Sequence, residues 1–149
     1  MYFLLPQVNY KFRVRALNIY GWGEFSTEAT FFTSDVPLGS SGITMQIVNM
    51  NVEVSWTLPF SNYDPIDSYR IKVLDSTGNQ YHLIETYCNG NLPFIVTERT
   101  CNIPMVALAN SPLNLPVNQE IVVQVTAHNA RGWGVEALST NGLLVQTVP

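Results

Sequence analysis

The sequence predicts an all-β protein, in which an antiparallel β-sandwich of seven strands follows an incomplete copy of the same fold. Three observations lead to this prediction. Apolar and polar residues alternate in short runs between turn residues, and no run has the periodicity of a helix. The composition, with 46% apolar and 12% charged residues, suits a β-rich core. One pattern also occurs twice, near the two ends of the chain.

The repeated pattern centres on a Gly-Trp-Gly tripeptide. Its first copy begins at Leu4 and reads LLPQVNYKFRVRALNIYGWGEFS, and its second begins at Leu115 and reads LPVNQEIVVQVTAHNARGWGVEALS. Aligning the tripeptides gives an offset of 111 residues, which suits a whole domain better than a solenoid repeat. We therefore expect residues 1–35 to be the C-terminal part of one domain and residues 36–149 to be a complete second domain.

The N-terminal segment has the pattern of a β-hairpin. Residues 8–18 alternate as one half-buried strand whose inward face carries Tyr10 and Phe12, and residues 24–33 return as the second strand. Residues 34–42 contain proline, glycine and serine, so we expect a short linker there.

The complete domain is expected to hold its seven strands at residues 43–48, 50–57, 67–74, 80–86, 102–108, 119–128 and 135–148. Alternation places Met50 inward together with the apolar residues that follow it on the second strand. Residues 88–100 are expected to be irregular. The predicted core between the sheets consists of Trp56, Tyr69, Val54, Ile71, Val123 and Val125.

The chain contains two cysteines, Cys88 and Cys101, and neither lies in a zinc-binding pattern. A disulfide between them would close a short loop and add about 3 kcal/mol of stability in the chain-entropy model. It would also indicate an oxidising compartment. The alternative is a pair of unbonded, buried thiols.

These strand patterns resemble those of the fibronectin type III domain. The pattern V-x-V-x-W ends at Trp56, Y-x-I-x-V begins at Tyr69, and the family's E–F corner is matched by Leu4, Pro6, Tyr10, Val14, Ala16, Asn18 and Gly21. The resemblance implies a tyrosine corner at Tyr10. The second copy has Ile121 at that position, so its corner hydrogen bond should be absent. The run from Cys101 to Met105 is also similar to fibronectin-like repeats in large surface proteins of protists, particularly ciliates.

Several classes of function are disfavoured by the residues present. The net charge of −4 argues against nucleic acid, and no run approaches the ~20 apolar residues of a membrane span. His82 and His128 have no nucleophile at motif spacing, so we predict no catalytic residue, no cofactor and no enzyme. Asp64 and Asp67 are too few to predict a calcium site.

Trp22 and Trp133 are the most suggestive residues outside the core, and with Tyr10 and Phe12 they are our candidate interface aromatics. Arg13 or Arg15 could stack on Trp22, whereas Gln124 and Thr126 occupy the same face in the second copy. Each ring either caps its own sandwich or anchors a neighbouring domain, chain or glycan.

We therefore predict an extracellular or cell-surface structural and adhesive module in a tandem array or filament, whose export signal lies outside this sequence. Its expected partners are neighbouring copies or adjacent repeats, with glycans as further candidates. The alternative is a receptor-type module that binds a ligand through the BC loop at Pro59–Asp64 and the C′E loop at Gly90–Arg99.

The hairpin in residues 1–34 is expected to be the last two strands of a domain whose first five strands are missing. Its apolar face needs a partner sheet, because an isolated hairpin is marginally stable at best in water. The partner is either a further domain N-terminal to Met1 or strands from a neighbouring molecule, which would build a head-to-tail filament. We favour the first, since no donor segment is identifiable.

Overall fold

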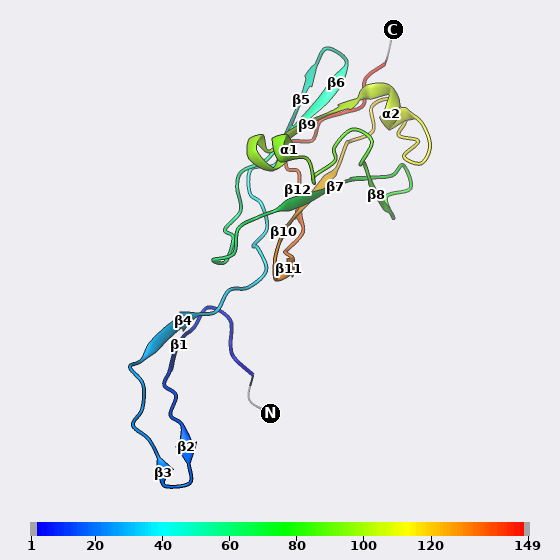
Figure 1. The fold of residues 1–149 in the computed structure, drawn as a ribbon. Helices are drawn as coiled ribbons and strands as arrows, with labels where there is room; N and C mark the ends of the chain where they lie inside the picture. The colour runs from blue at the N-terminus through cyan, green and yellow to red at the C-terminus, as the bar shows by residue number, and fades with distance from the viewer. Residues whose placement is uncertain (1–2, 148–149) are drawn as a thin grey trace. The chain divides into compact units, whose positions relative to one another are not determined.

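The computed structural model describes residues 3–147, so Met1 and the end of the predicted strand at Val148 lie outside the described residues. The chain divides into two compact units, Met1–Asp35 and Val36–Pro149 (Figure 1). Each unit is described below by itself.

The first unit is a hairpin built from two short antiparallel ladders. Strand β1 (Asn9–Phe12) pairs with β4 (Ala29–Phe32), and β2 (Leu17–Asn18) pairs with β3 (Gly21–Trp22). The prediction of one continuous strand over residues 8–18 was wrong. Between the ladders the hydroxyl of Ser26 accepts a hydrogen bond from the Val14 amide at 3.1 Å, where a ladder would use a backbone carbonyl.

The second unit contains two antiparallel sheets. One has three strands in the order β5 (Thr44–Val48), β6 (Asn51–Ser55) and β9 (Thr100–Pro104). The other has the order β11 (Gly132–Trp133), β10 (Val123–Asn129), β7 (Ser68–Leu74) and β8 (Tyr81–Leu83), with β12 (Ala137–Leu138) also paired to β10. The two sheets form the predicted all-β sandwich.

The core lies between these sheets and contains all six residues that alternation placed there. Trp56 is 4% exposed and contacts Tyr69 edge to face, with 5.2 Å between the ring centroids. Burial raises the pKa of the Tyr69 phenol. Neither the indole nitrogen of Trp56 nor the Tyr69 hydroxyl has a well-aligned hydrogen bond. Side-chain exposure is 0% at the other four positions, which are Val54, Ile71, Val123 and Val125.

Two short helices correct the prediction that the chain has none. Helix α1 (Pro93–Glu98) lies inside the segment predicted to be irregular, and α2 (Met105–Ala109) replaces the end of the strand predicted at residues 102–108. Proline suits the first turn of α1, because its missing N–H would have no partner there. Helix α2 consists mostly of strong helix formers and buries Met105 and Leu108, which lie on one face.

Other strand boundaries are also corrected. Met50 does not face inward, because Asn49 and Met50 have φ of 49° and 64° and form a two-residue hairpin turn, which leaves Met50 38% exposed. The predicted strands at 80–86, 119–128 and 135–148 are shorter than expected. Residues 118–121 bond instead to residues 143–145, as in the hydrogen bond from the Ile121 amide to the Leu143 carbonyl at 2.8 Å.

Candidate functional site

The predicted disulfide is present and buried. Cys88 and Cys101 are bonded with their Cα atoms 5.4 Å apart, and they are 1% and 5% exposed. The bond closes the segment that carries α1 and joins it to β9. It therefore restrains the C′E loop that the receptor hypothesis uses.

Tyr10 makes the corner hydrogen bond that its position implied. Its hydroxyl accepts a hydrogen bond from the Leu5 amide at 2.7 Å. In the second unit the equivalent of Tyr10 is Ile121, which is 1% exposed, and the equivalent of Leu5 is Pro116, which has no N–H. Both halves of the tyrosine corner are thus absent from the second copy.

The two Gly-Trp-Gly turns have the same backbone geometry. Gly21 and Gly132 have φ of 124° and 137°, a region that favours glycine. The side-chain oxygens of Asn18 and Asn129 each accept a hydrogen bond at 2.9 Å from the amide two residues later. The sequence repeat is therefore also a structural repeat of one hairpin.

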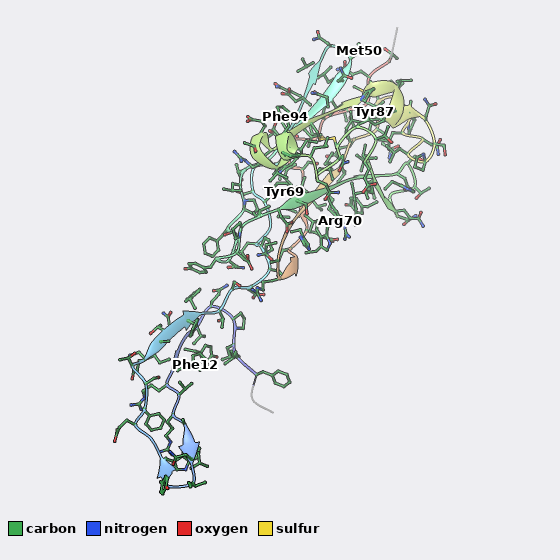
Figure 2. All side chains as sticks on the ribbon, in the orientation of Figure 1. Phe12, Met50, Tyr69, Arg70, Tyr87 and Phe94 are labelled. Carbon is green, nitrogen blue, oxygen red and sulfur yellow. A yellow bond between two sulfur atoms is a disulfide. The ribbon has the colours of Figure 1, made fainter. Side chains whose placement is uncertain are left out.

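The inward face of this hairpin is covered in the second unit and open in the first. Phe12 and Val14 are 44% and 72% exposed, whereas their equivalents Val123 and Val125 are each 0% exposed. Figure 2 shows Phe12 on the hairpin, and its ring contacts Phe31 edge to face at 5.6 Å between centroids. The same structural position is thus core in one copy and surface in the other.

The opposite face of the first hairpin carries interleaved cations and rings. The Arg15 guanidinium lies 4.5 Å from the Trp22 ring centroid and 4.7 Å from that of Phe25, and Arg13 lies 4.9 Å from Phe25. The expected stacking on Trp22 is present, although Trp22 remains 58% exposed. These contacts cover part of the indole ring and leave the rest accessible.

Trp133 stacks on a cation that the sequence did not reveal. Arg70 of β7 lies 3.8 Å from the Trp133 ring centroid, and the His128 ring on β10 lies 4.7 Å from it. Arg70 pairs with Thr126 across the two strands, so it reaches the face where we had expected only Gln124 and Thr126. The one sequence signal for this contact was the alternation of β7, which places Arg70 on the outward face. A hollow of about 170 Å³ adjoins the ring and is also lined by Glu85 and Asn91.

Each histidine lies beside a carboxylate, and His82 Nε2 is 3.4 Å from Asp75. His128 Nδ1 lies 2.7 Å from Asp67, and Ser68 donates a hydrogen bond to the same carboxylate. Burial raises the pKa of Asp67, but the interactions with His128, the hydrogen bond from Ser68 and a backbone hydrogen bond together lower it below its ordinary value. Ser68 and His128 both bond the Asp67 carboxylate and do not bond each other. An activated serine nucleophile would instead donate its hydroxyl to the histidine.

The loop carboxylates also have separate partners. The Arg131 guanidinium donates to Asp64 at 3.0 Å, while Asp67 bonds His128. Within residues 3–147 no cluster of three or more His, Cys, Asp or Glu side chains could hold a metal ion.

Both loops of the receptor hypothesis present exposed aromatic rings. Phe60 and Tyr63 in the BC loop contact each other edge to face at 5.4 Å and are 49% and 63% exposed. Phe94 on α1 is 65% exposed. The BC loop is anchored to β10, because the buried side-chain amide of Asn129 donates to the Ser61 carbonyl at 2.9 Å.

Comparisons with known proteins place these features in context. No protein-family model matches the chain. The human protein Host cell factor 2 is 28% identical over 141 residues, which covers 88% of this chain and 17% of that protein. The chain therefore spans about a sixth of that relative's length. The helices of the described residues are all too short or too polar to cross a membrane.

Solved structures share the fold. Domains A168–A170 of titin match with a TM-score of 0.57 and 19% identity over 92% of this chain and 41% of theirs. Domains d3–d4 of the extracellular region of rat CD45 match with a TM-score of 0.52 and 14% identity over 96% of this chain and 67% of theirs. The chain therefore has the fold of the fibronectin type III domains.

Proposed function

We propose that this chain is a non-catalytic repeat module of a tandem array, in which residues 1–35 are the F–G hairpin of a preceding domain and residues 36–149 are a complete domain. One observation carries the proposal. The hairpin face that is open at Phe12 and Val14 is fully covered at the equivalent Val123 and Val125. Repeated geometry with unequal burial supports the proposal that a second sheet covers the first copy.

The energetics support a partner sheet. Burying a side chain such as Phe12, Val14 or Phe31 stabilises a fold by about 1.5–3 kcal/mol, and an isolated two-stranded hairpin is marginal in water. The partner is either an adjacent repeat of the same polypeptide or a neighbouring copy, and we favour the adjacent repeat. An array of such modules serves spacing, adhesion or assembly.

An extracellular or cell-surface location fits this role. The buried bond between Cys88 and Cys101 is the kind that forms and persists in oxidising compartments. The domains of rat CD45 that share this fold belong to an extracellular region. A filament or adhesive surface coat is the assembly that this location and a repeated module favour.

Hydrogen exchange on the protein isolated from its natural source tests the array. The amides of β1 and β4 should be protected to a degree comparable with those of β10, because a sheet covers them. Exchange of β1 and β4 at the rate of an unstructured chain would refute the proposal. Protection that disappears on dilution would identify a neighbouring copy, rather than an adjacent repeat, as the source of the sheet.

Paired variants of the present chain give a second test. Val123→Ser should lower the free energy of unfolding of residues 36–149 by about 3 kcal/mol or more, because it places a polar group in the core. Phe12→Ser, at the equivalent position, should leave that free energy within about 0.5 kcal/mol. In the natural protein both substitutions should be strongly destabilising.

The receptor-type module is the second candidate, and the exposed rings of Phe60 and Phe94 favour it. The small hollow beside Trp133 combines an aromatic ring with polar side chains, a lining that suits a single sugar ring as ligand. Binding to an immobilised glycan panel that is lost in Phe60→Ser and Phe94→Ser, but kept in Phe12→Ser, would favour this candidate. Loss only in Trp133→Ala would identify the hollow as the site.

A further inference from the structure

Asn141 takes the place of a neighbouring strand at the open edge of the first sheet. Its side-chain nitrogen donates to the Met45 carbonyl at 2.7 Å, and its side-chain oxygen accepts from the Met45 amide at 3.2 Å. Strand β5, which contains Met45, pairs with β6 on one side only. The amide group of one side chain thus satisfies both backbone groups of Met45 at this edge.

The residue after Asn141 is Gly142, and both are exposed to water. An asparagine that precedes glycine is chemically labile, because no side chain hinders the next backbone nitrogen. That nitrogen attacks Cγ of the asparagine, a C–N bond forms, and the bond from Cγ to Nδ2 breaks as ammonia leaves. Water then opens the succinimide ring at either carbonyl and yields aspartate or isoaspartate. The net reaction consumes one water and needs no oxidant or reductant.

We propose that Asn141 is a deamidation site that the contact with Met45 controls. While both hydrogen bonds are made, the side-chain amide is held against β5 and cannot turn towards the nitrogen of Gly142. The reaction therefore requires that the segment around Asn141 move away from β5. The product cannot restore both hydrogen bonds: its carboxylate could still accept from the Met45 amide, but it has no N–H for the Met45 carbonyl and repels that oxygen.

Deamidation then has a structural consequence at the sheet edge. After deamidation the Met45 carbonyl has lost its donor and lies unpaired on an edge strand, and such an edge is a template for pairing with another chain. Deamidation would thus make the loss of this contact irreversible and expose an edge for β-strand addition. This inference does not depend on the proposed array.

The chain provides an internal comparison at Asn89, which precedes Gly90. Gly90 is buried, and a Cβ atom placed on it would lie 1.9 Å from the carbonyl oxygen of Tyr69. The Asn89 side-chain oxygen accepts a hydrogen bond from the Asn91 amide at 3.1 Å, and Asn89 adjoins the disulfide at Cys88. This backbone is fixed by packing, so Asn89 should react more slowly than Asn141 in the folded chain.

Peptide mapping by mass spectrometry, after prolonged incubation at neutral pH, tests the site and its control. Asn141 in the folded chain should deamidate about tenfold or more slowly than in a synthetic peptide of residues 138–145, because opening must break two hydrogen bonds. Adding sub-denaturing urea should remove most of this difference. Equal rates in the folded chain and the peptide would overturn the control by Met45, and no reaction in urea would overturn the site itself.

A substitution tests the consequence without waiting for the reaction. Asn141→Asp should increase the exchange rate of the Met45 amide by about tenfold, because repulsion between the carboxylate and the Met45 carbonyl moves the side chain away from β5. Thr140→Asp adds the same charge one residue earlier, at another exposed position, and should leave that rate unchanged. An unchanged Met45 exchange rate in Asn141→Asp would contradict the inference.

Discussion

The Arg70 guanidinium lies 3.8 Å from the centroid of the Trp133 ring and connects β7 to the Gly-Trp-Gly turn of the second unit. In the first unit the equivalent tryptophan, Trp22, is stacked by Arg15, which lies on its own hairpin. The two copies thus hold the same ring with cations from different strands. A stacked cation at this turn is a property of the position and not of one local sequence.

Arg70→Ala should destabilise the second unit by about 0.5–1 kcal/mol, because it removes a cation–π contact made by an exposed arginine. The measurement is a double-mutant cycle in urea with Trp133→Ala, which isolates the coupling between the two side chains. Lys72→Ala is the matched control, since Lys72 lies on the same strand and forms only a 4.0 Å ion pair with an exposed glutamate. A coupling energy near zero would contradict the stacking.

The contact between Arg70 and Trp133 illustrates what the sequence could and could not predict. Alternation within one strand placed Trp56 and Tyr69 inward, because a strand's two faces are determined by local pattern alone. It could not identify the ring that Arg70 contacts, because that depends on which distant strands pair. The sequence repeat was informative because it lies within one hairpin. Its geometry could therefore be predicted without knowing which distant strands pair.

The wrong predictions at α2 and at Met50 also have local causes. Ile103 and Met105 alternate as a strand would, so the strand pattern was extended across α2, whose helical signal is only a turn long. Met50 continued an apolar alternation into a turn that has positive φ at both central residues. In both cases apolar periodicity over a few residues fitted two structures, and tertiary packing selected the other one.

Cys101→Ser should lower the free energy of unfolding by about 3 kcal/mol, since the disulfide with Cys88 closes a loop across 13 residues. Chemical denaturation, followed by the fluorescence of the buried Trp56, measures this change. The doubly substituted chain, with Cys88→Ser added, controls for the reactivity of a single free thiol. Equal midpoints with and without a reducing agent in the parent chain would mean that the bond contributes nothing.

Trp56→Ala should cost about 3–5 kcal/mol, because it leaves a large cavity against Tyr69 between the two sheets. Thermal unfolding monitored by circular dichroism should show loss of the cooperative transition of the second unit or a large fall in its midpoint. Trp22→Ala is the control, because that ring is 58% exposed on the first unit. It should leave the transition of the second unit within about 0.5 kcal/mol of the parent chain.

Asp75 should give the second unit a measurable acid sensitivity. The Thr77 hydroxyl donates to its carboxylate at 2.6 Å and, with a smaller contribution from His82 and against the effect of burial, lowers the pKa of Asp75 from 3.8 to about 2. A folded pKa below the unfolded one means that unfolding takes up a proton between these values. The stabilisation is therefore complete above pH 3.8 and falls as the pH drops towards about 2.

Urea titrations across this pH range, with the parent chain and Asp75→Asn, measure the effect. The substitution should flatten the loss of stability on acidification, and Thr77→Val should flatten it in part. Glu98→Gln makes the same change in net charge at an exposed position and serves as the control. Identical pH profiles for Asp75→Asn and the parent chain would show that the Thr77 hydrogen bond does not hold the carboxylate.

The tyrosine corner gives the last prediction, because the two copies differ at both of its residues. Tyr10 accepts a hydrogen bond from the Leu5 amide, while the second copy has Ile121 and Pro116 at these positions. A tyrosine at position 121 would bury a hydroxyl opposite a residue with no N–H.

Ile121→Tyr should therefore be less stable than Ile121→Phe by about 1–3 kcal/mol. Both rings overpack the site, so this effect cancels when the two variants are compared. In a Pro116→Leu background the amide is restored, and the tyrosine variant should become the more stable of the two by about 0.5–1.5 kcal/mol. Urea denaturation of the four variants measures this reversal, and an order that Pro116→Leu does not change would mean that the second copy has lost more of the corner than its two hydrogen-bonding groups.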